Sequence, residues 1–189
     1  LSMDKSKLDE FINNTEGLAL YKFKIDEIMR QKPHILSEAE EKILALSSDA
    51  TDTADNVFSM FSDADLKFPE IKDDEGNLRE LTQGRYVSFL MSGKRDVREG
   101  AFKALYETYS KWRNTLAACL SGQVKSNRFI ARARNYNSCI EMYLDNDFVK
   151  TDVYNNLIET VENHLDKYQD YMEVKKKALG LDEIHMFDI

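Results

Sequence analysis

The sequence has few of the residues that interrupt regular structure. Its 189 residues include only two prolines and seven glycines. A fold built from many short strands needs a turn at the end of each strand, and Gly and Pro supply most such turns. Their scarcity favours long helices over a β-rich fold.

Cysteine is also scarce, with Cys119 and Cys139 alone and no CxxC pair. A chain of this length can bury a core without disulfides, so reduced thiols and a cytoplasmic location are expected. The start of the chain shows no pattern of a signal peptide. No apolar run approaches the roughly 18 residues that a membrane span needs.

The excess of acidic residues excludes a further class of function. The formal net charge is −8, whereas nucleic-acid binding depends on a strong positive field. Hydrophobic residues make up 42% of the chain and charged residues 32%, as in soluble globular proteins. We therefore expect neither a nucleic acid nor a membrane as partner.

The zinc-peptidase motif HExxH is absent from the chain. In that motif two histidines lie one turn apart on a helix and the Glu activates a metal-bound water. Here His34, His164 and His185 are scattered, and none has another His within four residues. Each is interpreted as a helix-end or surface residue, and no metal ligand is assigned.

Motifs for nucleophilic catalysis and phosphate binding are missing as well. Ser121-Gly122 lacks the leading Gly of G-x-S-x-G, and Gly93-Lys94 lacks the first Gly of a P-loop. Cys119 falls on the apolar stripe of an expected helix, which favours a core role over that of a nucleophile. No catalytic residue is assigned.

Helical periodicity dominates the N-terminal third of the chain. Residues 4–32 predict two short helices with a break at Gly17. Ser37 and Glu40 have the spacing of a capping box, which predicts a helix over about 38–47. The pattern continues in a short helix over 54–61.

A small β-hairpin is expected next, over about 67–81, because weak alternation flanks a turn-rich stretch at 73–77. A short helix follows at 83–91. The longest periodic stretches then predict two long helices, 95–134 and 151–179. The fold class is therefore mainly α, multi-helical, with two long helices and one small hairpin. Shorter elements are expected at 139–144, a helix, and at 184–189, the start of a strand.

Two groups of residues on the first long helix are open to two interpretations each. A basic cluster is either a solvated helix face or a site for an anion or a peptide carboxylate. A row of aromatic residues either packs between helices or lines a peptide groove. The cluster consists of Lys125, Arg128, Arg132 and Arg134, and the row of Tyr106, Tyr109 and Trp112.

Eight stretches carry more specific patterns, and they follow one another in a single register. They lie at 30–41, 56–60, 65–69, 81–86, 102–109, 114–117, 153–158 and 185–188. Together they resemble oligoendopeptidase F, a zinc metallopeptidase of the thimet oligopeptidase class. Residues 1–92 resemble the N-terminal lobe of that family, and 93–189 resemble the truncated start of its peptidase domain.

The resemblance implies a cytoplasmic endopeptidase that hydrolyses short peptides in a channel between lobes. The family holds zinc with HExxH and a further Glu, which would lie beyond Ile189, so no catalytic or metal role passes to a residue of this chain and the substrate-binding residues stay unknown. The chain is interpreted as an internal fragment, part of the channel wall in the full enzyme and inactive alone.

The alternative is a non-catalytic helical protein-interaction domain. An HExxH motif in the reading frame past Ile189 would favour the peptidase, and a stop codon would favour the interaction domain. The apolar stripes at 95–134 and 151–179, together with the expected strand edge at 184–189, also predict that the isolated fragment self-associates.

Overall fold

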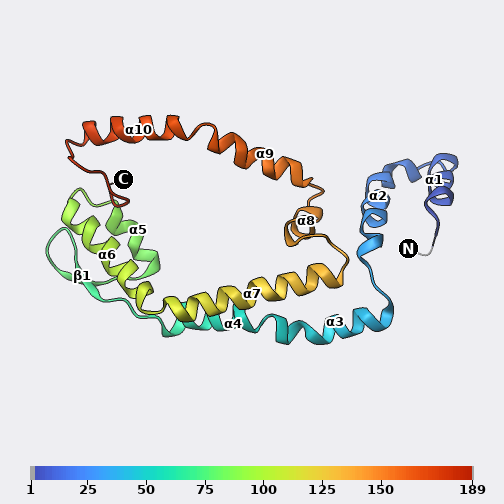
Figure 1. Cartoon of the computed structure of the whole chain (residues 1–189), viewed down its shortest axis with the longest axis horizontal. Coiled ribbons are helices and arrows are strands. Elements are labelled where there is room, and N and C mark those ends of the chain that lie inside the picture. Colours follow the sequence, from blue (N-terminus) through green and yellow to red (C-terminus); the bar gives the residue numbers. More distant parts are fainter. Residues whose placement is uncertain (1–2, 189) are drawn as a thin grey trace. The chain divides into compact units, whose positions relative to one another are not determined.

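The computed structural model describes residues 3–188 and is mainly α, as predicted (Figure 1). One two-stranded antiparallel sheet accompanies the helices in this part of the chain. The helices are α1 (Lys5–Asn14), α2 (Lys22–Gln31), α3 (Glu38–Thr51), α4 (Thr53–Met60), α5 (Gln83–Leu90), α6 (Arg95–Lys111), α7 (Arg113–Ala133), α8 (Cys139–Asp145), α9 (Thr151–Glu162) and α10 (Leu165–Ala178), and the strands are β1 (Glu70–Lys72) and β2 (Leu78–Glu80).

Two packed units share these elements, and neither is continuous in sequence. The first unit combines residues 1–52 with 124–150, and the second combines 53–123 with 151–189. The resemblance predicted a boundary near residue 92 between two domains of the family. That boundary is a different division from these packed units, and it stays a prediction.

Local signals set the helix starts of the first unit. Gly17 has φ +86°, a left-handed conformation that favours glycine, and the chain breaks there as predicted. The capping box is confirmed, because the Ser37 hydroxyl accepts from the Glu40 backbone N–H and the Glu40 carboxylate accepts from the Ser37 N–H. Helix α3 runs four residues past its predicted end at Ser47.

The second unit is built around a core of apolar side chains from the hairpin, α5 and α6. The predicted hairpin is present, with Ile71 opposite Arg79, and its turn is closed by the Asp73 carboxylate. That carboxylate accepts from the backbone N–H groups of Glu75 and Asn77 at 3.0 and 2.9 Å. The core residues are Leu81, Phe89, Val97, Ala101 and Leu105.

Both predicted long helices are interrupted by short breaks. The first ends at Trp112, which leaves helical geometry with φ −109° and ψ 11° while its indole packs edge-on against Phe61 at 5.2 Å. The second breaks around His164, whose ring Nδ1 donates to the Thr160 carbonyl oxygen at 2.7 Å. Such a bond competes with the helix ladder for that carbonyl. The predictions of single helices over 95–134 and 151–179 were therefore wrong in length.

The expected strand at 184–189 is also wrong for the described residues 184–188. Met186 and Phe187 form a turn, no residue of 184–188 takes part in a strand ladder, and Ile189 lies outside the described residues. The Asp188 N–H donates to the His185 carbonyl oxygen at 2.9 Å, which folds this segment back on itself. The unpaired strand edge expected here is therefore absent from the described segment.

Helices α4 and α7 approach closely at Gly122. A Cβ placed on Gly122 would lie 2.8 Å from the Ala54 Cβ, whereas one on Gly100, in α6, would meet nothing within 4 Å. We expect Gly122→Ala to lower the free energy of unfolding by about 1 kcal/mol, because the enforced shift outweighs the gain in helix propensity.

Gly100→Ala is the matched control, and it should raise the free energy of unfolding by roughly 0.5–1 kcal/mol. Urea unfolding of both variants followed by circular dichroism checks this. Stabilisation by both substitutions would show that α4 and α7 are not in contact at this point.

Candidate functional site

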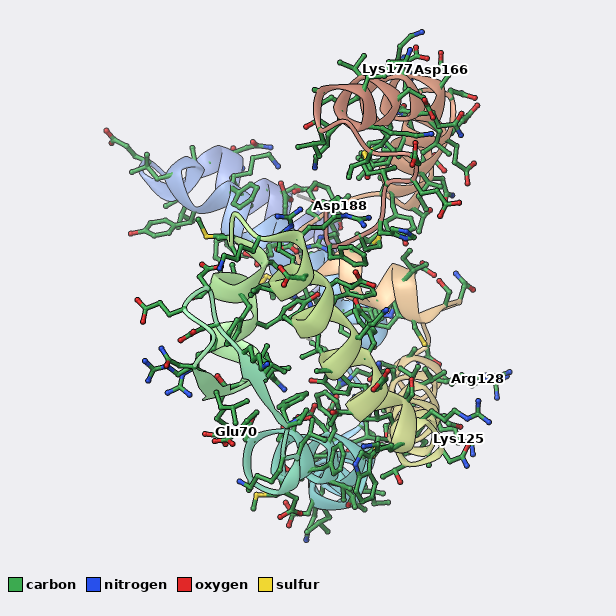
Figure 2. The ribbon with its side chains drawn as sticks, turned by 90° about the vertical axis from the view of Figure 1, so that its left-hand side faces the viewer. Glu70, Lys125, Arg128, Asp166, Lys177 and Asp188 are labelled. Carbon is green, nitrogen blue, oxygen red and sulfur yellow. The ribbon has the colours of Figure 1, made fainter. Side chains whose placement is uncertain are left out.

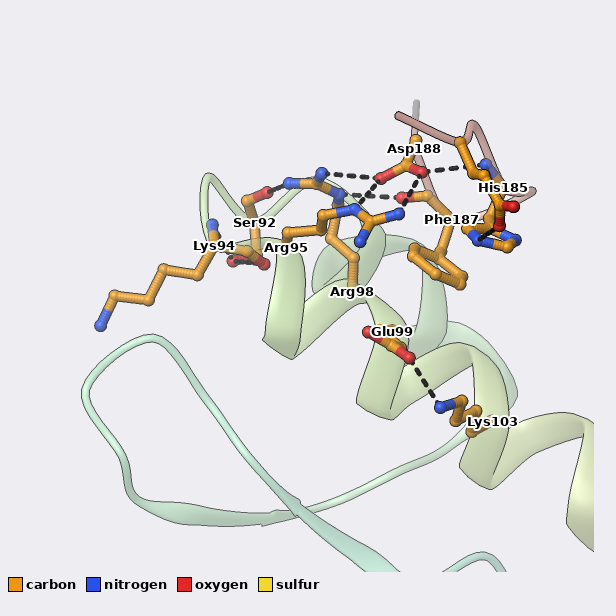
Figure 3. A network of polar contacts seen from close by, with 10 residues as sticks. Ser92, Lys94, Arg95, Arg98, Glu99, Lys103, His185, Phe187 and Asp188 are labelled. Atoms are coloured by element: carbon orange, nitrogen blue, oxygen red, sulfur yellow. Dashed lines mark hydrogen bonds and ion pairs between the residues drawn. The ribbon is translucent and has the colours of Figure 1, made fainter. Parts of the chain in front are cut away.

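Asp188 is the centre of a polar network that joins segment 184–188 to α6 (Figure 3). It is 1% exposed. Arg95 donates to its two carboxylate oxygens from Nε at 2.9 Å and Nη2 at 3.0 Å, and Arg98 Nη2 donates at 3.3 Å. The His185 backbone N–H adds a bond at 2.9 Å. This carboxylate is thus fully hydrogen-bonded, as a buried charge needs to be.

Phe187 fixes the same segment through its backbone and its ring. Its carbonyl oxygen accepts from Arg98 Nε at 2.8 Å, and its ring lies edge-on to Phe102 at 5.6 Å. The Arg95 guanidinium lies 5.1 Å from the ring centroid. Segment 184–188 is therefore held against α6 by two arginines that are three residues apart.

The electrostatics of this network favour permanent charge. The hydrogen bonds from Arg95 lower the pKa of Asp188 to about 2, and those from His185 and Arg98 act in the same direction. The pKa of Arg95 is raised by the same pair. Neither group exchanges a proton near neutral pH, so the network positions the chain and does not act as an acid or base.

A second polar cluster lies in the first unit, around Asp145. The Asp145 carboxylate and carbonyl accept from Arg30, and its carboxylate accepts from the Tyr136 hydroxyl at 2.9 Å. Burial, together with this hydrogen bond, raises the pKa of Tyr136 to about 12. The His34 ring stacks on Tyr136 at 3.6 Å. The pKa of the Tyr136 hydroxyl is thus moved further from neutral pH, and the cluster joins α2 to α8 within the first unit.

The three histidines lie apart, in different surroundings. His34 donates from Nδ1 to the Arg134 carbonyl oxygen at 2.8 Å, His164 lies at the start of α10, and the His185 ring stacks on Phe187 at 5.1 Å. Residues 3–188 contain no group of three or more His, Cys, Asp and Glu that could hold a metal ion. The residues of the described chain thus do not fit a zinc site.

The cysteines and the lysine of the rejected motifs have ordinary roles. Cys119 and Cys139 are free and half-buried. Cys119 lines an apolar pocket of about 380 Å³, which also contains Phe58 and Leu120. Lys94 donates from Nζ to the Asp74 carbonyl oxygen at 2.6 Å.

The basic cluster does not remain together. Arg134 forms a two-pronged pair with Glu41, with both bonds at 2.9 Å. Lys125, Arg128 and Arg132 are exposed along one face of α7 and have no ion-pair partner within residues 3–188. Figure 2 shows Lys125 and Arg128 pointing away from the helix. The interpretation as a solvated helix face therefore fits the first three residues of the cluster, whereas Arg134 forms a structural ion pair.

The aromatic row is partly packed and partly open. Tyr109 accepts a hydrogen bond from Gln83 at 2.8 Å and lies edge-on to Phe68. Tyr106 and Trp112 remain 48% and 45% exposed. All three rings therefore pack against a neighbour, Trp112 against Phe61 and Tyr106 against Phe102, while Tyr106 and Trp112 also offer exposed aromatic surface to a ligand.

Sequence reasoning singled out neither Asp188 nor Asp145 as a polar centre. Their arginine partners lie 93 and 115 residues away, at Arg95 and Arg30, and no local pattern connects them. Only the resemblance at 185–188 marked the first of these segments.

Two family models match the chain. The model described as Oligopeptidase F matches residues 1–68, and the model of peptidase family M3 matches residues 88–189, more than half of the chain. The chain belongs to peptidase family M3. The expected resemblance to oligoendopeptidase F is thereby confirmed, and it places this M3 chain among metallopeptidases.

Relatives of this M3 chain are longer than it is. The chain is 43% identical over its full length to oligopeptidase PepF of Bacillus subtilis (strain 168) and covers 28% of that protein. It is 36% identical to group B oligopeptidase PepB of Streptococcus agalactiae and covers 31% of it. The crystal structure of oligoendopeptidase-F from Enterococcus faecium matches with a TM-score of 0.89 and 34% identity, over 99% of this chain and 37% of that one.

None of the helices within residues 3–188 is both long enough and apolar enough to cross a bilayer.

The loss of stability caused by Asp188→Asn should depend on pH in a defined way, because only the wild-type carboxylate titrates. The folded-state pKa of about 2 lies below the ordinary value of 3.8, so the charged pair stabilises the fold above about pH 4 and ceases to do so as the pH falls toward 2. At pH 7 we expect the variant to lose about 2 kcal/mol of unfolding free energy.

Urea unfolding of wild type and variant at pH 7, 4 and 2.5 measures that difference. It should shrink at the lowest pH. Asp166→Asn, at an exposed position of α10 (Figure 2), is the control and should change little. A deficit for Asp188→Asn that persists unchanged at pH 2.5 would assign the loss to packing instead of charge.

Proposed function

We propose that this chain is part of a zinc-dependent oligoendopeptidase that hydrolyses short peptides in the cytoplasm. The observation that carries this proposal is the succession of two family models, Oligopeptidase F over residues 1–68 and peptidase family M3 over 88–189, in one chain. The name oligopeptidase, borne by relatives at 43% and 36% identity, supports a short-peptide substrate.

Within such an enzyme the chain contributes to the wall of the substrate channel. Tyr106 and Trp112 offer half-exposed aromatic surface on α6 and at the α6–α7 junction, which suits contact with a peptide. Residues 1–92 would belong to the N-terminal lobe and 93–189 to the start of the peptidase domain. The zinc ligands would come from outside this chain, because its histidines do not converge.

A segment exchange tests the proposal directly. Residues 1–189 replace the matched segment of Bacillus subtilis PepF, and cleavage of a short unstructured peptide in the presence of zinc is followed by mass spectrometry. We expect the chimera to cleave the peptide at a rate within about tenfold of PepF, because related segments exchange best when volume and patterning are kept. A folded chimera that cleaves nothing contradicts the proposal.

The isolated chain should behave differently from the chimera. We expect it to carry no stoichiometric zinc and to cleave no peptide, because three separate histidines cannot supply a tetrahedral site. Elemental analysis of the purified chain, before and after dialysis against a chelator, measures the metal. One tightly held zinc per chain would show that ligands converge in a way that the structure does not describe.

A further inference from the structure

Helix α9 presents an apolar face that no described residue of its own unit covers. All twelve residues of α9 are described, and none is buried. Its apolar side chains recur at three- and four-residue spacing, so they share one side of the helix. They are Val153, Tyr154, Leu157, Ile158 and Val161, continued by Leu165 of α10, and each is between 40% and 61% exposed.

Such a helix needs a partner. Isolated helices of about 12 residues are marginal in water, and a helix in a protein is stabilised chiefly by burying its apolar face. The crystal structure from Enterococcus faecium nevertheless matches 99% of this chain with a TM-score of 0.89, and 63% of that protein (100 − 37) lies outside the match. We therefore infer that the surface covering the corresponding helix in that protein belongs to the part outside the matched segment.

Charge argues against a second copy as the partner. Helix α9 carries Asp152, Glu159 and Glu162 and neither Lys nor Arg. Pairing two copies along this helix would bring six carboxylates together with no compensating cation of their own. A partner whose rim is neutral or basic fits better.

We propose that the apolar face of α9 is the docking surface for the remaining part of an M3 peptidase, and that docking requires no covalent connection between the two parts. The partner is a folded polypeptide with a complementary apolar ridge and a neutral or basic rim. The proposal rests on the function proposed above only through family membership, because binding is measured without substrate.

The PepF chimera provides the test, since it folds as a whole before it is cut. A flexible linker with a protease site is inserted after residue 189, the site is cleaved, and gel filtration reports whether the two pieces remain together. We expect the pieces to stay associated one to one. Leu157→Glu places a charge in the docked face and should weaken the association by about tenfold or more.

Asn156→Glu is the matched control. It introduces the same residue at the preceding position of the same helix, outside the apolar stripe, and should leave association within about twofold. In the isolated chain both variants should melt at the wild-type temperature, because Leu157 is already 61% exposed there. A change confined to the nicked chimera therefore reports docking and not the fold of this chain.

The proposal would be overturned if the cut pieces of the wild-type chimera separate, if the chimera is insoluble, or if both substitutions weaken association equally. It would also be overturned if Leu157→Glu breaks up a homo-oligomer of the isolated chain while leaving the nicked chimera intact. The last result would identify a second copy as the partner. A chimera that stays associated but cleaves no peptide refutes the proposed activity and leaves docking standing.

Discussion

The burial of one carboxylate constrains the second unit more than any other contact. Asp188 is removed from water almost completely, which is costly unless every lone pair finds a donor. Arg95 and Arg98 supply those donors from the first turn of α6, because positions three apart lie on one helix face. The segment after α10 must therefore return to the start of α6. Since α6 also carries Val97, Ala101 and Leu105 of the core, the polar anchor and the apolar core share one helix.

This anchor explains how α9 and α10 can be ordered with little burial of their own. The two helices are tied at the far end by segment 184–188, and the breaks near His164 and Gly180 leave each helix short. In Figure 2 the labelled side chains Asp166 and Lys177 point away from the α10 ribbon. Position is thus set by a few directional bonds at one end, whereas the apolar stripe of α9 stays open for a larger surface.

What the sequence predicted well was local. The capping box at Ser37, the left-handed Gly17 and the turn-rich stretch of the hairpin each depend on residues within about five positions, so their signals are complete in a short window. The helix breaks at Trp112 and His164 escaped because apolar periodicity continues across a one- or two-residue interruption. The role of Asp188 was not predicted because its partner Arg95 lies 93 residues earlier in the sequence. Only the fold brings the two residues together.

Several polar groups of this chain are paired within the chain, whereas part of its apolar surface is exposed. Its main carboxylate–guanidinium pairs, at Asp188, Asp145 and Glu41, are saturated by arginines of the same unit, and its histidines contact carbonyl oxygens or rings. The three carboxylates could bind a metal only by giving up the ion pairs that hold these segments together. Uncommitted apolar and aromatic surface remains on α9 and around Tyr106 and Trp112, among other places. This division of roles agrees with the proposed function, in which the chain would supply shape and contact surface and the reactive groups would come from elsewhere.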